Sequence, residues 1–390
     1  MTLGLGVVGL GTAGAAMLGA AFAHPGVTVA AVADLDLAWL GSAPDRPPRR
    51  YDSLERLLRD DGVEAVHIAT PTPLHYEHVR QALDAGRHVI VEKPVTAGLR
   101  EAQDLVTRAA ALDRVVIVGH SEAFEPYVQA VREVIAFGTI GAPVMVLAEK
   151  FTDWMRRPRL PEEWDGAAGG GIIRRQGVHQ VDVVRTVAGT RFSVREAAVR
   201  IDQERGVPGG YTAWLASERG PSAVVSHDGI GRLSPAAVHQ SRPAAADEAD
   251  KRSRRQALLR QVLDQRSAPR LGAADRERLL VLGSDGEINA TARRVSVTTA
   301  AGTAEVGLAG FAEGRHAVLD ELISTLGGTA SPVHTLAWGL ESLRTCEDIE
   351  RAAFAARGRQ TALTGNCSAL THSRPRLATS FSKGIVSPTA

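Results

Sequence analysis

A glycine motif near the start of the chain constrains the fold more than any other feature. Gly9, Gly11 and Gly14 form a G-x-G-x-x-G pattern after a short apolar run, and an alanine-rich stretch follows over 12–23. Between a strand and a helix, the first glycine permits a tight turn, the second lets the backbone approach a pyrophosphate, and the third allows close packing of the helix on the strand. The motif therefore predicts a dinucleotide-binding Rossmann fold.

The residues around this motif extend the predicted cofactor site. Thr12 and Ala13 open the helix, whose first backbone amides would bind phosphate. Asp34 ends the next apolar run, about 20 residues downstream, where a carboxylate hydrogen-bonds the ribose hydroxyls. Because a carboxylate repels a 2′-phosphate, and Leu35 and Asp36 supply no arginine to bind one, the sequence predicts NAD rather than NADP. The alternative is a Rossmann fold that binds another ligand.

The order of the apolar runs predicts two domains. Up to about residue 120, short β-branched runs alternate with helical patterns, which is typical of an α/β fold with a parallel sheet. Longer runs separated by turns follow and predict an α+β domain with a large, mostly antiparallel sheet. We therefore predict a Rossmann domain over 1–121, a domain for substrate binding and oligomerisation over 122–364, and a disordered tail rich in Ser, Thr and Pro over 365–390.

Hydrophobic periodicity also predicts the individual elements. Strands are expected at 3–8, 27–33, 65–68, 88–91, 115–118, 144–151, 194–202, 211–217, 222–227, 278–283, 286–291, 294–299 and 304–308, and helices at 12–23, 126–137, 172–187, 311–326 and 335–356. The segment 241–270 fits neither pattern because it is charged and alanine-rich. Acidic residues beside its basic run at 251–255 favour a solvated helix face over a binding patch.

Composition and charge exclude several classes of partner. The 390 residues include 45 basic and 44 acidic side chains, so no overall field favours nucleic acid or an acidic membrane surface. No apolar run approaches the roughly 20 residues of a transmembrane helix, and the first residues lack the basic region of a signal peptide. Cys346 and Cys367 form no disulfide or metal-binding pattern. We expect a cytoplasmic protein with a small-molecule substrate, no metal site, and neither nucleic acid nor membrane as partner.

Polar residues follow two further strand-like runs. Thr70, Pro71 and His75 follow one run, and Glu92 and Lys93 follow the next. Because ligands of open α/β sheets bind outside the carboxyl ends of the strands, all five are candidate cofactor-binding residues. Thr70 could instead cap a turn, and His75 could simply begin a helix.

Lys93 is also a candidate for the chemical step. Near the positive nicotinamide ring, and partly desolvated, its ammonium form is destabilised, which makes the amine a proton acceptor for alcohol oxidation. The alternative is a surface ion pair with Glu92 that contributes less than about 1 kcal/mol.

Three further motifs follow the glycine pattern in order. They are ATPTPLH at 69–75, EKP at 92–94 and GGGIIRRQGVHQVD at 169–182. Together the four motifs resemble the Gfo/Idh/MocA family, which includes glucose–fructose oxidoreductase and inositol dehydrogenase, and the resemblance covers about residues 3–365. It implies an N-terminal Rossmann domain and a C-terminal α/β domain whose large sheet often makes oligomer contacts. We therefore expect a homodimer or homotetramer.

The resemblance also implies that Lys93 and His179 lie beside the nicotinamide and are catalytic. If residues 172–187 are helical, Arg175, His179 and Asp182 lie at i, i+4 and i+7 on one face. His179 titrates near neutrality and can bind a substrate hydroxyl or relay its proton. We expect Arg175, His179 and Asp182 to contact the substrate, although Asp182 could instead anchor the helix against the domain.

Arg175 stands where many members of the family have an acidic residue. It belongs to a set of five arginines that would flank the cleft: Arg156, Arg157, Arg159, Arg174 and Arg175. The planar guanidinium suits bidentate recognition of a carboxylate, so Arg159 and Arg175 are candidate substrate residues. Several of the five could instead lie at the surface or pair with Glu162 and Glu163.

Three stretches narrow the resemblance within the family. Residues 119–124, 151–165 and 169–182 are similar to the phthalate 4,5-cis-dihydrodiol dehydrogenases and their relatives. This similarity implies NAD-dependent oxidation of a carboxylated cyclic dihydrodiol, whose enone product tautomerises to an aromatic catechol. Two alternatives stay open: a sugar or inositol dehydrogenase or a ketoreductase of the same family, and a dinucleotide-binding regulator without catalytic activity.

Overall fold

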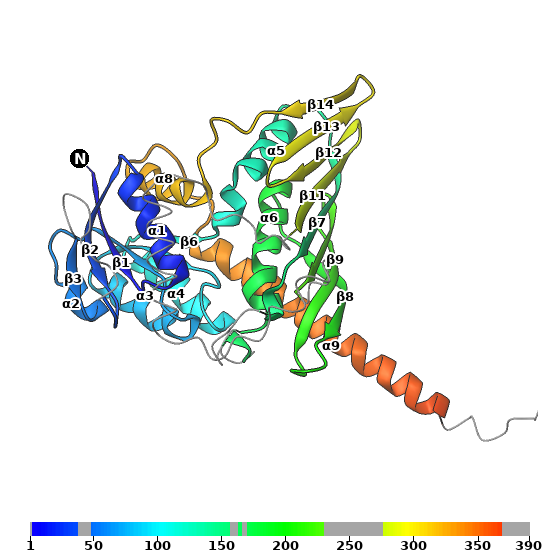
Figure 1. Cartoon of the computed structure of the whole chain (residues 1–390), viewed down its shortest axis with the longest axis horizontal. Coiled ribbons are helices and arrows are strands. Elements are labelled where there is room, and N and C mark those ends of the chain that lie inside the picture. The colour runs from blue at the N-terminus through cyan, green and yellow to red at the C-terminus, as the bar shows by residue number, and fades with distance from the viewer. Residues whose placement is uncertain (1, 38–47, 157–162, 166–169, 230–275, 369–390) are drawn as a thin grey trace, which may run out of the picture.

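Two β-sheets organise the molecule. The computed structural model describes residues 2–37, 48–156, 163–165, 170–229 and 276–368, with side chains in the last helix up to Arg357. Figure 1 shows the smaller sheet beside a larger one, whose inner face carries α5 (Pro126–Ala136) and α6 (Val178–Ala188). The predicted fold class, a Rossmann α/β domain with an α+β domain, is confirmed.

The smaller sheet has six parallel strands in the order β3-β2-β1-β4-β5-β6. Leu5 and Val7 of β1 belong to the apolar cluster on one face, and Val8 belongs to the cluster on the other. A strand buried on both faces needs a nearly continuous apolar run, which is what the sequence has here. Its elements are β1 (Leu3–Val8), α1 (Thr12–Ala23), β2 (Val27–Ala33), β3 (Arg49–Tyr51), α2 (Leu54–Leu58), β4 (Ala65–Ile68), η2 (Thr72–Leu74), α3 (His75–Asp84), β5 (His88–Glu92), α4 (Leu99–Ala111) and β6 (Val116–Gly119).

The larger sheet has eight strands in the order β14-β13-β12-β11-β7-β10-β9-β8. β7 and β10 pair in parallel and the other neighbours pair antiparallel. Side chains alternate along β10, where Ala223, Val225 and His227 face the core. The elements of this domain are η3 (Ser121–Phe124), β7 (Pro143–Phe151), η4 (Trp154–Arg156), η7 (Ile173–Gly177), β8 (Ser193–Ile201), β9 (Pro208–Ala216), β10 (Ser222–Asp228), β11 (Arg276–Gly283), β12 (Gly286–Thr291), β13 (Arg294–Thr299) and β14 (Gly302–Val306).

Two late helices join the domains. α8 (Gly314–Leu326) returns to the Rossmann sheet, where Val318 and Leu322 pack in the cluster that contains β1 and α1. α9 (Leu336–Ser368) begins on the opposite face of that sheet with Leu340 and Leu343, and then crosses to the larger sheet (Figure 1). The region 122–364 therefore contributes side chains to the core of both domains.

The bounds of α2, α3 and α4 were not predicted, and three other elements differ from the sequence prediction. The short strand β3 was not expected, because a three-residue edge strand has almost no periodic signal. Residues 173–177 form a π-helical turn instead of the start of an α-helix. α9 continues to Ser368, into the predicted tail, because extending an existing helix costs little and residues 357–368 contain no proline. The segment 241–270 and residues 369–390 lie outside the described residues.

Within the described ranges, no helix has the length and hydrophobicity needed to cross a membrane.

Candidate active site

The three glycines of the motif occupy three different environments. Gly9 has φ +81°, and a Cβ there would lie 2.7 Å from the carbonyl oxygen of Ala69. A Cβ on Gly14 would lie 1.8 Å from the carbonyl oxygen of Gly9, so helix packing excludes a side chain. Gly11 has φ −65° and no atom within 4 Å of its Cβ position. Neither backbone conformation nor packing therefore requires glycine at position 11, which fits a site kept open for a pyrophosphate.

The start of α1 offers hydrogen-bond donors to that open space. Gly11 is the N-cap and has no side chain to bind the first amides, and the first turn contains no acidic residue. Thr12 is exposed and Ala13 is half-buried at the beginning of the helix. The first amides of a helix lack partners within it and favour anions, so these residues fit a diphosphate.

Asp34 connects the end of β2 to the glycine turn. Its Oδ2 accepts a hydrogen bond from the Leu10 amide at 2.5 Å, and its Oδ1 accepts one from the Asp36 amide at 2.9 Å. Each carboxylate oxygen has a second lone pair, which leaves capacity for ribose hydroxyls. A carboxylate that binds the ribose from this position would repel the 2′-phosphate of NADP.

His75 is buried at the edge of the parallel sheet and does not face the solvent. Only 1% of its surface is exposed, and its ring nitrogens lie 2.9 Å from the Pro94 carbonyl and 2.8 Å from the Thr70 carbonyl. Burial lowers the pKa of His75, against the effect of these two hydrogen bonds. His75 therefore holds the loops after β4 and β5 together instead of offering its ring to a cofactor, which corrects the expected contact. Pro71 is exposed beside it.

Thr70 is partly buried, and its hydroxyl lies 3.0 Å from Nδ1 of His78 in α3. This contact fixes the hydroxyl at the start of the loop and agrees with the alternative that Thr70 stabilises the turn.

Lys93 lies at the carboxyl end of β5, where its Nζ donates a hydrogen bond to the Arg175 carbonyl at 3.2 Å. Burial lowers its pKa from 10.5 to about 8, and the charges of Arg175 and Lys150 act in the same direction. Glu92 and Glu122 oppose this shift. A fraction of the amine is therefore neutral near pH 7, so it can accept a proton.

Glu92 faces the interior. Only 8% of its surface is exposed, and its Oε1 lies 3.7 Å from Nε2 of His67. Burial would raise its pKa, but His67, Arg315 and Lys93 outweigh that effect and lower it to about 2. Glu92 is thus a permanent anion behind Lys93, and its burial does not favour the predicted direct contact with a cofactor.

His179 lies near the start of α6 with 7% of its surface exposed. Burial lowers its pKa well below 6.5, and the positive charges of Lys93 and Lys150 add to the shift. The imidazole is therefore neutral at neutral pH. A neutral histidine has one nitrogen that donates and one that accepts a hydrogen bond, which suits a residue that binds a hydroxyl.

Two charged residues that the sequence prediction missed stand beside His179. Lys150 of β7 is only 5% exposed, and its Nζ donates a hydrogen bond to Glu122 Oε1 at 2.7 Å. The same Oε1 lies 3.7 Å from Nδ1 of His179. One signal could have revealed Lys150, since it continues the inward-facing positions of Val146 and Ala148 along β7.

Arg175 points toward the loop after β4. Its guanidinium forms an ion pair with Glu163 at 3.1 Å and donates a hydrogen bond to the Thr72 hydroxyl at 3.3 Å. The π-helical turn adds a residue to the helical repeat, so the predicted α-helical spacing from Arg175 to His179 does not hold. Arg174 points instead to α9, where it pairs with Glu350 at 2.8 Å. The candidates Arg157 and Arg159 lie outside the described residues.

Asp182 is completely buried and does not reach a surface that a substrate could contact. It accepts a hydrogen bond from the indole of Trp338, and its Oδ2 lies 3.7 Å from both His120 and His334. These partners come from the end of β6 and the start of α9. Asp182 therefore anchors α6 against its neighbours, and its predicted contact with substrate is corrected.

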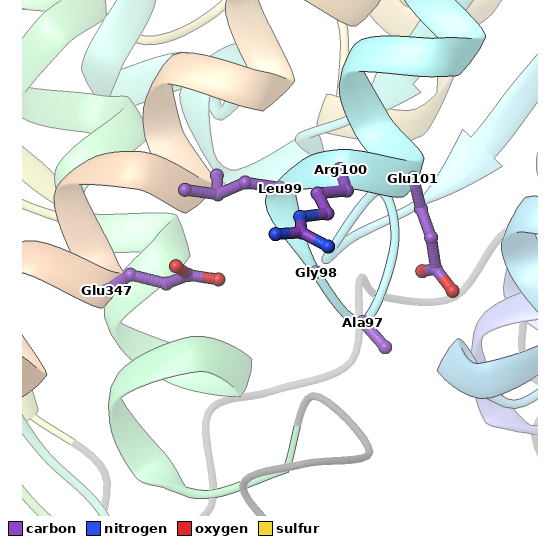
Figure 2. A pocket seen from close by; sticks show the side chains of 6 residues that line it. All are labelled: Ala97, Gly98, Leu99, Arg100, Glu101 and Glu347. Carbon is purple, nitrogen blue, oxygen red and sulfur yellow. The ribbon is translucent and has the colours of Figure 1, made fainter.

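A hollow of about 480 Å³ opens at the start of α4 (Figure 2). Its lining consists of Ala97, Gly98, Leu99, Arg100, Glu101 and Glu347. None of the predicted site residues lines it, so we do not identify this hollow with the active site. In the described residues, no group of three His, Cys, Asp or Glu side chains could hold a metal ion.

The glycine turn, Asp34 and Lys93 lie at the carboxyl edge of the parallel sheet, where open α/β sheets bind their ligands. His179 is close enough for the charge of Lys93 to lower its pKa. Residues 3–120 match the model of an oxidoreductase family with an NAD-binding Rossmann fold, and residues 128–253 match the GFO/IDH/MocA C-terminal domain. The chain therefore belongs to the Gfo/Idh/MocA family of NAD-dependent oxidoreductases, and the predicted family, enzyme class and cofactor are confirmed.

Full-length relatives agree with this assignment. The chain is 29% identical over 370 residues to the 1-carboxy-3-chloro-3,4-dihydroxycyclohexa-1,5-diene dehydrogenase of Comamonas testosteroni, a match that covers 88% of this chain and 92% of the relative. A solved structure from Bordetella bronchiseptica RB50, provisionally assigned as a dehydrogenase, is 27% identical with a TM-score of 0.75, over 91% of this chain and 99% of that chain.

An oxidoreductase from Agrobacterium radiobacter, solved with NAD⁺, L-tartaric acid and magnesium, is 19% identical with a TM-score of 0.72, over 90% of this chain and 96% of that chain. At this identity the similarity demonstrates the shared fold alone.

Proposed function

We propose that this enzyme oxidises a hydroxyl group of a carboxylated cyclic dihydrodiol, with Lys93 and His179 as its catalytic residues. The observation that carries the proposal is a lysine with a pKa of about 8 beside a neutral histidine at the sheet edge. The name of the Comamonas relative describes a ring with one carboxyl and two hydroxyl groups, which supports the substrate class.

NAD⁺, when bound, supplies the hydride acceptor. Gly11, Thr12, Ala13 and Asp34 would hold its diphosphate and ribose, as their geometry allows. In the proposed mechanism Lys93 takes the proton of the reacting hydroxyl at its Nζ, while the imidazole of His179 binds the neighbouring hydroxyl of the diol and orients the ring.

Arg175 is the described residue proposed to bind the substrate carboxylate. Its ion pair with Glu163 uses part of the guanidinium, whose five N–H donors leave capacity for a second acceptor. The same ion pair reduces the positive charge available to a carboxylate. A neutral polyol, as in a sugar or inositol dehydrogenase, is therefore the competing substrate class.

Turnover with NAD⁺ on a matched set of substrates tests these proposals. A carboxylated cis-dihydrodiol, the same ring without its carboxyl group, and inositol should be compared at equal concentrations. We expect kcat/KM to be highest for the carboxylated ring, and Lys93→Met to lower it by about 10² to 10⁴-fold for every substrate. A preference for inositol would support the polyol alternative, and binding of NAD⁺ without any turnover would support the regulator.

We also propose that a second copy of the chain covers the outer face of the larger sheet. Trp214, Val224, Leu147 and Leu280 are direct neighbours across β9, β10, β7 and β11 and form one apolar row on that face. Trp214 is 46% exposed. Light scattering should find a dimer or tetramer that Leu147→Glu dissociates, and a wild-type monomer would exclude this assembly.

A further inference from the structure

Glu122 connects the catalytic histidine to a buried lysine. Its Oε1 accepts a hydrogen bond from Lys150 at 2.7 Å and lies 3.7 Å from Nδ1 of His179. The three side chains come from separate elements, η3, β7 and α6. Their meeting is therefore a product of tertiary packing at the junction of the two domains.

Stability alone does not explain the pair of Lys150 and Glu122. Replacing a buried ion pair by apolar residues of similar volume is often neutral or stabilising. Lys150 lies on the core-facing side of the larger sheet, where an apolar residue would pack. Its register neighbours are His227 of β10 and Glu277 of β11. The carboxylate of Glu122, which accepts the hydrogen bond from Lys150, also faces His179. This second contact suggests a function for the ion pair.

Two buried atoms at this junction lack a hydrogen-bond partner among the described residues. They are Nδ1 of His179 and Oε2 of Glu122. Leaving buried polar atoms unpaired is destabilising. The 3.7 Å separation exceeds hydrogen-bond range, but catalytic hydrogen bonds are often long in the free enzyme and tighten in the substrate complex. A small approach of Glu122 would satisfy Nδ1.

The protonated nitrogen of a neutral imidazole is set by the partner of the other nitrogen. A carboxylate accepts hydrogen bonds only, so Glu122 favours the form in which Nδ1–H donates to it and Nε2 carries the lone pair. In that form Nε2 accepts a hydrogen bond from the substrate hydroxyl next to the reacting one, while the proton of the reacting hydroxyl goes to Lys93. The opposite tautomer would present an N–H group to the substrate and could not accept this hydrogen bond.

We propose that Glu122 is a positioning residue that fixes the Nδ1–H tautomer of His179, and that Lys150 holds Glu122 in place for this task. The kinetic part of this inference rests on the proposed dehydrogenase function. The tautomer itself does not depend on the identity of the substrate.

Nitrogen NMR of the NAD⁺-bound protein, labelled at histidine, measures the tautomer directly. The His179 signals are assigned by their loss in His179→Asn. We expect the wild type to show Nδ1–H and a non-protonated Nε2. In the double variant Glu122→Gln/Lys150→Met, which removes both charges of the pair, Nε2–H should become populated. A wild-type His179 protonated at Nε2 overturns the proposal whatever the variants do.

Kinetics separate positioning from a structural role. We expect the double variant to lower kcat by about 10- to 100-fold, the usual effect of losing a partner that orients a histidine, with KM for NAD⁺ unchanged. Glu122→Asp keeps the carboxylate, so its kcat should lie between those of the wild type and the double variant. Glu125→Gln removes a half-buried carboxyl group close to Glu122 and is the control, with tautomer and kcat expected unchanged.

Two results would contradict this reasoning. An unchanged tautomer in the double variant shows that Glu122 does not set it, even if kcat falls. An altered tautomer with normal kcat shows that positioning has no kinetic role. If no dihydrodiol is a substrate, the proposed function is refuted. The NMR experiment still tests, independently of the substrate, whether Glu122 sets the tautomer of His179.

Discussion

Turnover should rise with pH through the titration of Lys93, because only its neutral amine accepts a proton from a substrate hydroxyl. Burial, Arg175 and Lys150 together lower the pKa of this lysine from 10.5 to about 8. The difference of about 2.5 units makes the neutral fraction at pH 7 roughly 300-fold larger than in an ordinary lysine, or about a tenth of the protein. Below about pH 7, kcat/KM should therefore fall about tenfold per pH unit, and above about pH 9 it should level off.

Glu92→Gln tests the cause of this pKa. Glu92 is the main charge that raises the pKa of Lys93, and its own pKa of about 2 keeps it ionised throughout the measurement. Removing its charge destabilises the ammonium form, so the midpoint should move to lower pH by about one unit. Glu133→Gln on the exposed side of α5 removes an equal charge far from the lysine and should leave the midpoint unchanged.

The assay is the initial rate of NADH formation at saturating NAD⁺, recorded between about pH 6 and pH 10 in buffers of equal ionic strength. The positive nicotinamide ring acts in the same direction as Arg175, so the midpoint should lie at or below about 8. A midpoint near 10.5, or a flat profile, would refute Lys93 as the proton acceptor. A shift of the Glu92→Gln midpoint to higher pH would refute the electrostatic reasoning.

Four further substitutions test other parts of the site. Gly11→Ala should weaken NAD binding about tenfold or more, measured by calorimetry, and leave the melting temperature nearly unchanged, whereas Gly14→Ala should destabilise the fold because its Cβ meets backbone. Arg175→Gln should raise KM for a carboxylated substrate about tenfold and leave KM for inositol unchanged; equal effects on both would remove its role as a carboxylate ligand. Asp182→Ala should cost about 1–3 kcal/mol of unfolding free energy in urea titrations, because the Trp338 indole loses its acceptor.

Local sequence patterns predicted the backbone and the cofactor half of the site. The positive φ of Gly9 and the contact of Gly14 with the Gly9 carbonyl lie within one strand, turn and helix, so they are visible in a short stretch of sequence. Asp34 and Lys93 end strands whose order in a parallel sheet follows from the alternation of strands and helices. Position at the carboxyl edge was therefore predictable for both residues.

Side-chain environments were not predictable in the same way. His75 and Asp182 have sequence contexts as suggestive as that of His179, yet the first is closed between two carbonyls and the second is enclosed by Trp338 and two histidines. Lys150 and Glu122 lie 28 residues apart, in a strand and a turn that meet only where the domains join.

The sequence by itself thus determined the Rossmann fold, the NAD site and the lysine at the sheet edge, because glycine sterics and hydrophobic periodicity act over a few neighbouring residues. The tertiary structure alone decided the pKa of Lys93, the neutral state of His179 and the carboxylate that faces it. Burial and nearby charges control protonation, and these depend on residues distant in sequence that only packing brings together.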